Sequence, residues 1–140
     1  MDARWRLRQV ANLLNLSTPI GLLLALAGRA RITRGVDGIL LAHGWRLPAK
    51  APAFTIGNVV LLRLSDDDLA RRPRLLVHEA RHSTQYACCV GPVMFLLYLG
   101  ASAWSHLRCG DHSSYNVFEV RAGLEDGGYT DRRRRSEARA

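Results

Sequence analysis

The sequence predicts an α+β protein that is mostly helical, with a short β-sheet beside a central helix and two further apolar helices. Three observations lead to this fold class. Apolar residues recur at helical spacing over residues 73–86. Two runs rich in β-branched and apolar residues, 54–56 and 59–62, flank a Gly-Asn pair and are typical of strands. Two longer apolar stretches, 10–28 and 93–107, have the length and composition of helices.

A chain of 140 residues has room for one hydrophobic core, so we expect a single domain over residues 1–130. Within this domain we expect an apolar helical region at 1–34, short strands at 35–64 and further helices at 69–126. The remaining segment, 131–140, contains a run of arginines and is expected to be a basic, disordered tail.

Capping residues and helix breakers predict where the helices begin and end. Thr18 is expected to cap a second N-terminal helix. Ser65, followed by three aspartates, predicts another helix start, because acidic residues stabilise the first turn. Gly91-Pro92 is expected to end the central helix, and a final helix over 116–124 is expected to end at Gly127-Gly128.

The formal net charge of +8 comes almost entirely from arginine and favours acidic partners such as nucleic acid, anionic lipid or acidic substrates. No basic stretch is interleaved with aromatics as in a known nucleic-acid module, so no specific nucleic-acid binding is expected. The three cysteines, Cys88, Cys89 and Cys109, predict buried, reduced thiols in a cytoplasmic protein. A disulfide from Cys109 to either of the other two is the alternative in an oxidising compartment.

The two apolar stretches also raise the question of membrane association. Residues 10–28 are interrupted by polar residues and lack a signal-peptide cleavage site. Residues 86–104 carry no charge over almost a full membrane span, but Gly91-Pro92 leaves an uninterrupted run whose length is more typical of a buried helix. The sequence favours core helices, and leaves open whether 10–28 and 86–107 contact a membrane surface.

The central helix contains the sequence His-Glu-Ala-Arg-His at residues 78–82. Positions i and i+4 lie on one face of a helix, so His78 and His82 project two imidazoles toward a single ion. Glu79 lies beside that ion without binding it, and can take a proton from metal-bound water. This spacing predicts a Zn²⁺ site in which Glu79 is the catalytic base.

A catalytic zinc needs a third protein ligand and an open fourth position. The candidates downstream are His106, Cys109, Asp111, His112 and Glu119. Glu119 is preferred, because it lies in a largely apolar segment, 116–122, that can dock as a helix. The small Ala122 would allow this helix to approach the first one closely.

Four further residues are candidates for supporting roles. His112 is an alternative ligand, or could polarise a substrate carbonyl, as could Tyr115 or Tyr129. Gln85 lies one turn beyond His82 and could hydrogen-bond a ligand histidine.

Three segments together carry a family resemblance. They are Ala53-Phe54-Thr55-Ile56-Gly57-Asn58-Val59-Val60-Leu61, His78-Glu79-x-x-His82-x-x-Gln85 and Asn116-x-Phe118-Glu119-x-x-Ala122. In this combination the chain resembles small gluzincin-type (minigluzincin-like) metallopeptidases with an HExxH motif, above all short actinobacterial proteins. The resemblance implies a zincin-like core with a strand near the active-site helix. It also implies that His78, His82 and Glu119 are the zinc ligands and that Glu79 is the catalytic base.

The sequence therefore predicts a zinc-dependent hydrolase, and most specifically a metallopeptidase that acts on a peptide or protein substrate. The alternative is a non-catalytic, zinc-stabilised domain that binds a partner or a membrane surface through its basic and apolar flanks. In that case His112 or Cys109 would complete the coordination sphere. A third interpretation is an arginine-rich protein associated with nucleic acid, in which the HExxH motif occurs by chance.

Overall fold

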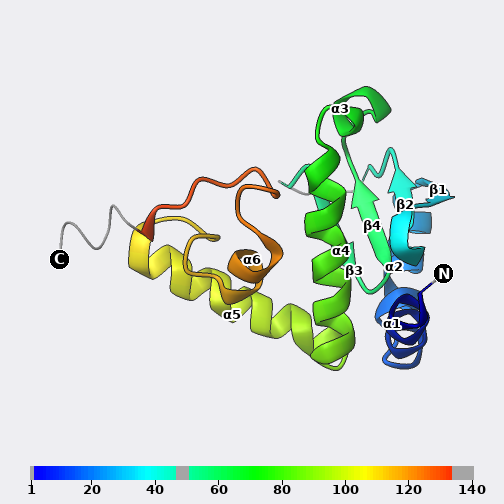
Figure 1. Ribbon diagram of the computed structural model, residues 1–140, viewed down its shortest axis with the longest axis horizontal. Coiled ribbons are helices and arrows are strands. Elements are labelled where there is room, and N and C mark those ends of the chain that lie inside the picture. Colours follow the sequence, from blue (N-terminus) through cyan, green and yellow to red (C-terminus); the bar gives the residue numbers. More distant parts are fainter. Residues whose placement is uncertain (1, 47–50, 134–140) are drawn as a thin grey trace.

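The computed structural model, which describes residues 2–46 and 51–133, contains a four-stranded sheet with helices on both faces (Figure 1). The helices are α1 (Ala3–Leu14), α2 (Ser17–Ala27), α3 (Asp66–Ala70), α4 (Pro73–Cys88), α5 (Pro92–Cys109) and α6 (Val117–Ala122), with a short 3-10 helix, η1 (Val36–Gly38). The strands are β1 (Arg31–Arg34), β2 (Leu40–His43), β3 (Ala53–Ile56) and β4 (Val59–Leu62). The predicted α+β, mostly helical fold class is confirmed.

The sheet is mixed and has the strand order β1-β2-β4-β3. β1 pairs antiparallel with β2, β2 runs parallel to β4, and β3 and β4 form the hairpin around the Gly-Asn pair. Gly57 in this turn has a φ of +61°, and a Cβ there would lie 2.4 Å from the backbone nitrogen of Thr18. Glycine is therefore required for the turn to approach α2. Among the strands that the structure describes, β3 pairs with β4 alone and forms one edge of the sheet.

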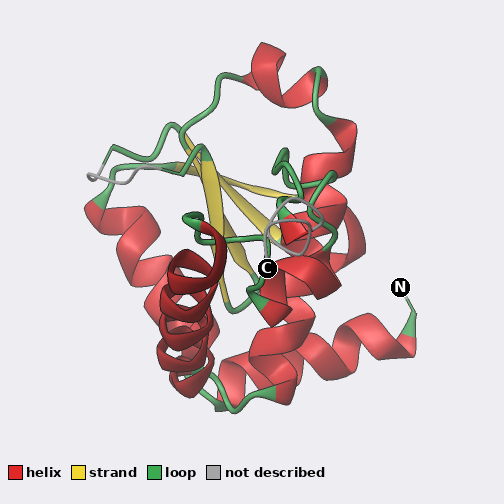
Figure 2. Cartoon of the chain, turned by 90° about the vertical axis from the view of Figure 1, so that its left-hand side faces the viewer, coloured by secondary structure: helices red, strands yellow, loops and turns green. Residues whose placement is uncertain are grey.

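Different helices cover the two faces of the sheet (Figure 2). α4 packs on one face in a cluster of buried apolar residues: Ile39, Leu41, Ala53, Val60, Leu62, Leu75 and Ala80. α2 packs on the other face in a second cluster: Ala25, Ala42, Trp45, Val59 and Leu61. All of β4 is buried because both of its faces are covered, whereas burial alternates along β3. This alternation turns Ala53 and Thr55 toward α4.

Several predicted helix boundaries are confirmed. The side-chain oxygen of Ser65 accepts a hydrogen bond from the backbone N–H of Asp68 (3.1 Å) and caps α3. α4 begins at Pro73, a position at which proline is well tolerated because the first helical N–H has no intrahelical partner. Gly91-Pro92 separates α4 from α5, as expected.

The start of α2 differs from the prediction that Thr18 caps it. The helix begins at Ser17, after Leu16 in the left-handed conformation with a φ of 67°. The hydroxyl of Thr18 accepts a hydrogen bond from the backbone N–H of Asn58 (3.1 Å). The Thr18 hydroxyl, which the local sequence pattern predicts to cap α2, thus joins α2 to the β3–β4 turn.

Two other segments depart from the expected boundaries. Residues 31–34, placed in the helical region 1–34, form β1 because they pair with β2 along their whole length. The last helix, expected over 116–124, ends at Gly123, which has a φ of +94°, rather than at Gly127-Gly128. In both cases the position of a neighbouring element decides the end of the segment.

The expectation of a disordered tail over 131–140 is wrong for its first residues. The backbone N–H of Arg132 donates to the hydroxyl of Ser114 (2.9 Å), which fastens this segment to the loop after α5. Residues 134–140 lie outside the described residues, as do residues 47–50 of the predicted strand region.

The three cysteines are free thiols, as preferred from the sequence, but they are not buried. Cys88 is exposed, and Cys89 and Cys109 are half-buried. The prediction of buried thiols is therefore wrong, because these residues lie at the C-terminal ends of α4 and α5, where the helices leave the core.

Candidate metal centre

α4 holds the His-Glu-Ala-Arg-His segment in the interior of the protein. Leu75 and Ala80 anchor the helix in the apolar cluster on the sheet. The side chains of His78, Glu79 and His82 are nevertheless also buried, at 2%, 4% and 7% exposed. Buried polar groups need partners, so the contacts of these three side chains indicate what the site can do.

Glu119 comes from α6, which packs against α4. The side-chain oxygen of Asn116 caps α6 by accepting the Phe118 backbone N–H (3.0 Å), and its amide nitrogen donates to the Ser102 hydroxyl on α5 (2.9 Å). Ala122 is fully buried, so a small residue occupies the inner side of this short helix. Glu119 is 2% exposed.

The structure brings together the three residues predicted as metal ligands. The Nε2 atoms of His78 and His82 are 3.1 Å apart. Oε2 of Glu119 lies 3.2 Å from Nε2 of His78 and 3.5 Å from Nε2 of His82. One potential ligand atom from each of the three residues thus lies within 4.8 Å of the other two.

Hydrogen bonds on the opposite ring nitrogens orient both histidines. Nδ1 of His78 lies 2.9 Å from the carbonyl of Gly123, which can only accept, so this nitrogen carries the proton. The amide nitrogen of Gln85 donates to the carbonyl of Phe118 (2.9 Å), which turns the amide oxygen toward Nδ1 of His82 (2.8 Å). In the neutral imidazoles, both Nε2 lone pairs therefore point into the cluster. The hydrogen bond predicted for Gln85 is present.

The centre of the cluster contains acceptors without donors. Oε2 of Glu119 is buried and has no hydrogen-bond partner. The lone pairs of His78 and His82 face this oxygen and each other, an arrangement that is unfavourable unless a cation or a shared proton lies between them. Two imidazoles and one carboxylate are common ligands of divalent metals. His78, His82 and Glu119 therefore form a group that could bind a metal ion.

Tyr98 of α5 binds the other carboxylate oxygen, Oε1 of Glu119, through its hydroxyl group. Burial raises the pKa of Tyr98, and the Glu119 charge raises it further, so the hydroxyl remains a donor. Burial also raises the pKa of Glu119. A proton on the imidazoles of His78 and His82, shared with this carboxylate, and the hydrogen bond from Tyr98 would each favour the charged form, and they hold the pKa of Glu119 well below its ordinary value.

Sequence reasoning did not identify Tyr98. This tyrosine lies within the apolar run 93–107, where its ring fits the apolar pattern of the helix. A buried tyrosine usually finds a partner for its hydroxyl, so a single phenol in an apolar helix is a usable signal. The sequence alone does not identify the hydrogen-bond partner of this hydroxyl, because Glu119 lies on another helix.

Glu79 lies on the side of α4 that faces β3. Its Oε2 accepts a hydrogen bond from the Thr55 hydroxyl (2.7 Å). Burial raises the pKa of Glu79 above its ordinary value, although His82, Thr55 and His78 act in the opposite direction. The carboxyl group is therefore held in place and is more basic than an exposed glutamate.

The other predicted supporting residues lie farther from the three ligand atoms. His112 is exposed and packs edge-on against the ring of Tyr129 (5.4 Å between centroids), which in turn lies 6.0 Å from the ring of His78. Tyr115 packs against Arg108 of α5, with the guanidinium 5.3 Å from its ring. Tyr129 thus stands between His112 and the metal cluster, and the contact of Tyr115 lies outside it.

The remaining ligand candidates serve the loop after α5 or face solvent. Oδ1 of Asp111 accepts the backbone N–H of Ser114 (2.7 Å), and the thiol of Cys109 donates to the carbonyl of Ser105 (3.3 Å). His106 is exposed. Within residues 2–46 and 51–133, the group with metal-ligand spacing includes none of these candidates.

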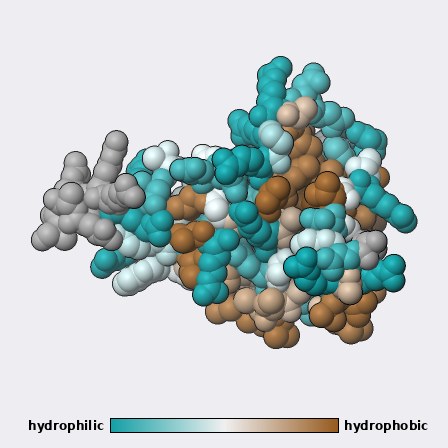
Figure 3. All heavy atoms as spheres, viewed as in Figure 1, coloured by the Kyte–Doolittle hydropathy of each residue, from teal (hydrophilic) through white to brown (hydrophobic). Residues whose placement is uncertain are grey.

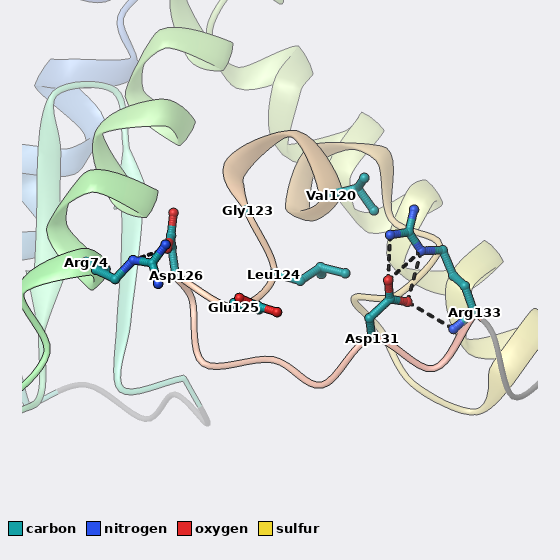
Figure 4. A pocket seen from close by; sticks show the side chains of 8 residues that line it. All are labelled: Arg74, Val120, Gly123, Leu124, Glu125, Asp126, Asp131 and Arg133. Carbon is teal, nitrogen blue, oxygen red and sulfur yellow. Dashed lines mark hydrogen bonds and ion pairs between the residues drawn. The ribbon is translucent and has the colours of Figure 1, made fainter.

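The loop after α6 covers the ring of His78. A Cβ at Gly127 would lie 2.6 Å from a carbon of that ring, so glycine allows the loop to approach this closely. The same loop borders a cavity of about 300 Å³ that Gly123 lines (Figure 4). Figure 4 shows Arg74 of α4 facing Asp126 of the loop, and their ion pair (2.7 Å) holds the loop against α4.

No protein-family model, curated protein or solved structure matches this chain. The metal-binding group is thus defined by the chain's own geometry, and the gluzincin resemblance remains a prediction from the sequence.

Proposed function

We propose that the protein is a zinc-dependent hydrolase, and specifically a metallopeptidase. The observation that carries this proposal is the convergence of His78, His82 and Glu119 on one point, with the carboxylate of Glu79 buried on the next position of the same helix. Three protein ligands and an adjacent carboxylate are the parts that a hydrolytic zinc site requires.

The donor set favours zinc over harder cations. Two imidazole nitrogens and one carboxylate oxygen suit Zn²⁺, whereas Mg²⁺ and Ca²⁺ prefer oxygen ligands alone. His78, His82 and Glu119 would hold the ion. When bound there, zinc would supply a Lewis acid that acidifies water and polarises a carbonyl group.

Glu79 would act as the general base. A base works best near neutral pH when its pKa is raised toward the working pH, and burial raises the pKa of Glu79. The hydrogen bond from Thr55 fixes the carboxyl group, so that it can take a proton from the attacking water and pass it to the leaving amine.

The position of β3 favours an extended peptide as substrate. β3 is an edge strand, and Thr55 within it contacts Glu79 directly. An edge strand offers unpaired backbone groups to which an extended peptide can add as a further strand. A peptide bound in this way would run beside the proposed base.

A non-catalytic metal site is the second candidate, and the burial of the cluster favours it. His78, His82 and Glu119 are at most 7% exposed, and Gly127 and Tyr129 lie over His78. Structural zinc sites are closed, whereas catalytic sites keep a position open for water and substrate. In this second function the ion would hold α4 to α6.

Glu79→Gln separates the two functions. For a hydrolase, the variant should retain about one zinc per chain and lose peptide hydrolysis by about 100-fold or more. Zinc would be measured by mass spectrometry of the purified protein, and hydrolysis on a mixture of unstructured peptides. Glu125→Gln, an exposed residue in the loop after α6, is the matched control and should leave both quantities unchanged. Equal hydrolysis by the two variants, or none by the zinc-loaded parent, would contradict the hydrolase and favour the structural site.

A further inference from the structure

The polarity of α1 is inverted relative to a helix on the surface of a water-soluble protein. Its buried residues, Arg8 and Asn12, are polar. Arg8 donates to the carbonyl of Ala80, and Asn12 donates to the carbonyl of Ser83 (2.9 Å), so the polar face is bound to α4. The exposed face carries apolar side chains, among them Leu7, Val10, Leu13 and Leu14. A helix in water normally buries its apolar stripe, so the outward apolar face of α1 indicates that another apolar surface contacts it.

α5 shows the same inversion. Only Met94 and Ser105 are buried along this largely apolar helix. Polar groups point inward: Tyr98 donates to Glu119, and the hydroxyl of Ser105 accepts the Tyr115 backbone N–H (2.8 Å). The exposed positions are mostly large and apolar, namely Val93, Phe95, Leu96, Leu97, Leu99 and Leu107. An apolar helix of this kind is ordinarily covered on most sides.

The turn after α1 and the turn before α5 lie against each other. The side-chain amide of Asn15, after α1, donates to the carbonyl of Tyr86 near the end of α4 (3.1 Å). A Cβ at Gly91 would lie 2.5 Å from the carbonyl oxygen of Asn15. Leu16 and Val90, one in each turn, are 60% and 70% exposed. Figure 3 shows apolar side chains gathered along the lower edge of the molecule, below α1 and the α4–α5 turn.

The charge along the chain follows this arrangement. No acidic or basic residue occurs between Arg8 and Arg29, and only His82 and His106 are titratable bases between Arg81 and Arg108. No single helix among the described residues is long and apolar enough to cross a membrane. Two bent pairs, α1 with α2 and α4 with α5, meet the same criterion of length and composition together, at bends of 75° and 117°. Both bends lie at the adjoining turns.

Arginine and tryptophan flank the uncharged stretches at the ends of α1 and α5 that lie away from these turns. The guanidinium group of Arg4 lies 5.8 Å from the ring of Trp5. The guanidinium group of Arg108 lies 5.6 Å from the ring of Trp104. Tryptophan and arginine beside an apolar face are typical of helices that lie in the headgroup region of a bilayer.

The geometry points to a membrane-docking surface, which we name the lipid face: Leu7, Val10, Leu14, Val90, Val93 and Leu96. We infer that this face enters the apolar boundary of an anionic bilayer, with α1 and α5 as interfacial helices. The net charge of +8 and the flanking arginines match negatively charged headgroups, which favours a lipid surface over a second copy of the same basic chain. The inference does not depend on the proposed hydrolase.

Vesicle sedimentation of the full chain tests the lipid face. Vesicles of phosphatidylcholine with about one-third phosphatidylglycerol should bind the protein, and more tightly than pure phosphatidylcholine. Leu14→Glu and Leu96→Glu, at positions 76% and 68% exposed, should each weaken binding by about tenfold or more, because each removes one inserted leucine and adds a charge. The control is Ile32→Glu on β1, outside the lipid face, and it should bind as the parent does.

Circular dichroism would establish that all three variants are folded, which their exposed positions favour. Lipids that carry a quencher in the acyl chains should reduce the fluorescence of Trp104, which is 55% exposed on α5. Trp45 should respond less, because it is buried beside the sheet. Equal binding by all variants would overturn the inference. So would a parent that ignores vesicles but forms dimers that Leu14→Glu dissociates, since the same face would then join two copies of the chain.

Discussion

Two buried polar clusters lie side by side on α4 and differ in one respect. In the asparagine cluster, Asn12 and Ser83 both donate to the side-chain oxygen of Asn58, at 3.1 and 2.7 Å. In the metal cluster, His82, the residue before Ser83, joins His78 and Glu119. The first cluster supplies a donor for each of these acceptors, whereas the second places three acceptors together without a donor between them.

This difference separates a structural network from a binding site. A satisfied buried network stabilises the contact between its elements and needs nothing from outside. A buried cluster of acceptors is unfavourable until a cation or a proton enters. Burial is nearly the same in the two clusters, so donor–acceptor balance, and not exposure, indicates which one binds a ligand.

Removing Glu119 should have the largest effect on the metal cluster. Glu119→Ala leaves two histidines, too few to hold zinc in a three-ligand site, so metal content should fall from about one ion per chain toward none. The measurement is mass spectrometry of protein purified without chelators. Glu125→Ala is the matched control, because it removes an exposed carboxylate of the same type. Unchanged metal content in Glu119→Ala would show that the ligand assignment is wrong.

The asparagine cluster should respond in stability instead. Asn12→Ala removes one of the two donors to the side-chain oxygen of Asn58 and the side-chain donor to the Ser83 carbonyl, and leaves a small void between α1 and α4. The free energy of unfolding, measured in urea, should fall by about 1–3 kcal/mol, with metal content unchanged. Thr84→Ala, whose hydroxyl bonds within its own helix, should change it by less than about 0.5 kcal/mol. Loss of metal in Asn12→Ala would mean that the two clusters are not independent.

Tyr98 should affect the zinc affinity of the metal cluster without being a metal ligand. Tyr98→Phe removes the hydrogen bond to Oε1 of Glu119 and should lower zinc affinity by about 10–100-fold without unfolding the protein. Competition with a chromogenic chelator measures this affinity. Tyr115→Phe makes the same chemical change where the ring packs on Arg108, and should leave affinity unchanged. Equal affinities in the two variants would remove Tyr98 from the site.

The smallest expected effect is a pH dependence with opposite signs for the two forms of the protein. Burial by itself lowers the pKa of His82, but the carboxylates of Glu119 and Glu79 raise it above its ordinary value. In metal-free protein, the stabilisation that protonated His82 gains from these carboxylates is fully present below a pH of about 6.5. It is lost as the pH rises through the raised pKa of His82. In zinc-loaded protein, stability should rise over the same range, because the metal competes with the proton. If the melting temperature changed with pH in the same way with and without chelator, zinc and the His82 proton would not share a site.

Much of the site follows from short-range pattern. The spacing of His78 and His82 fixes their common face once the helix forms, and Gln85 lies one turn further along it. Glu119 could be proposed because the segment around it has the composition of a docking helix. Tyr98 and Thr55 could not be assigned, because the contact of each with a glutamate depends on how α5 and β3 are placed against α4 and α6.

The same division applies to the fold. Propensity and turn residues predicted the β3–β4 hairpin and the α4–α5 break, since both are decided by neighbouring residues. The capping role expected of Thr18 was wrong, because its hydroxyl binds the backbone of Asn58, 40 residues away. β1 was missed, because four residues become a strand only when β2 lies alongside.

The sequence by itself determined the two-histidine face, the neighbouring glutamate and the fold class, because these depend on backbone periodicity and local chemistry. The tertiary structure alone decided that Glu119 meets the histidines, that no donor lies between them, and that α1 turns its polar face inward. The physical reason is the separation along the chain of the residues that interact. Helix geometry relates residues one turn apart, whereas the partners of a buried polar atom are chosen by packing between elements distant in the chain.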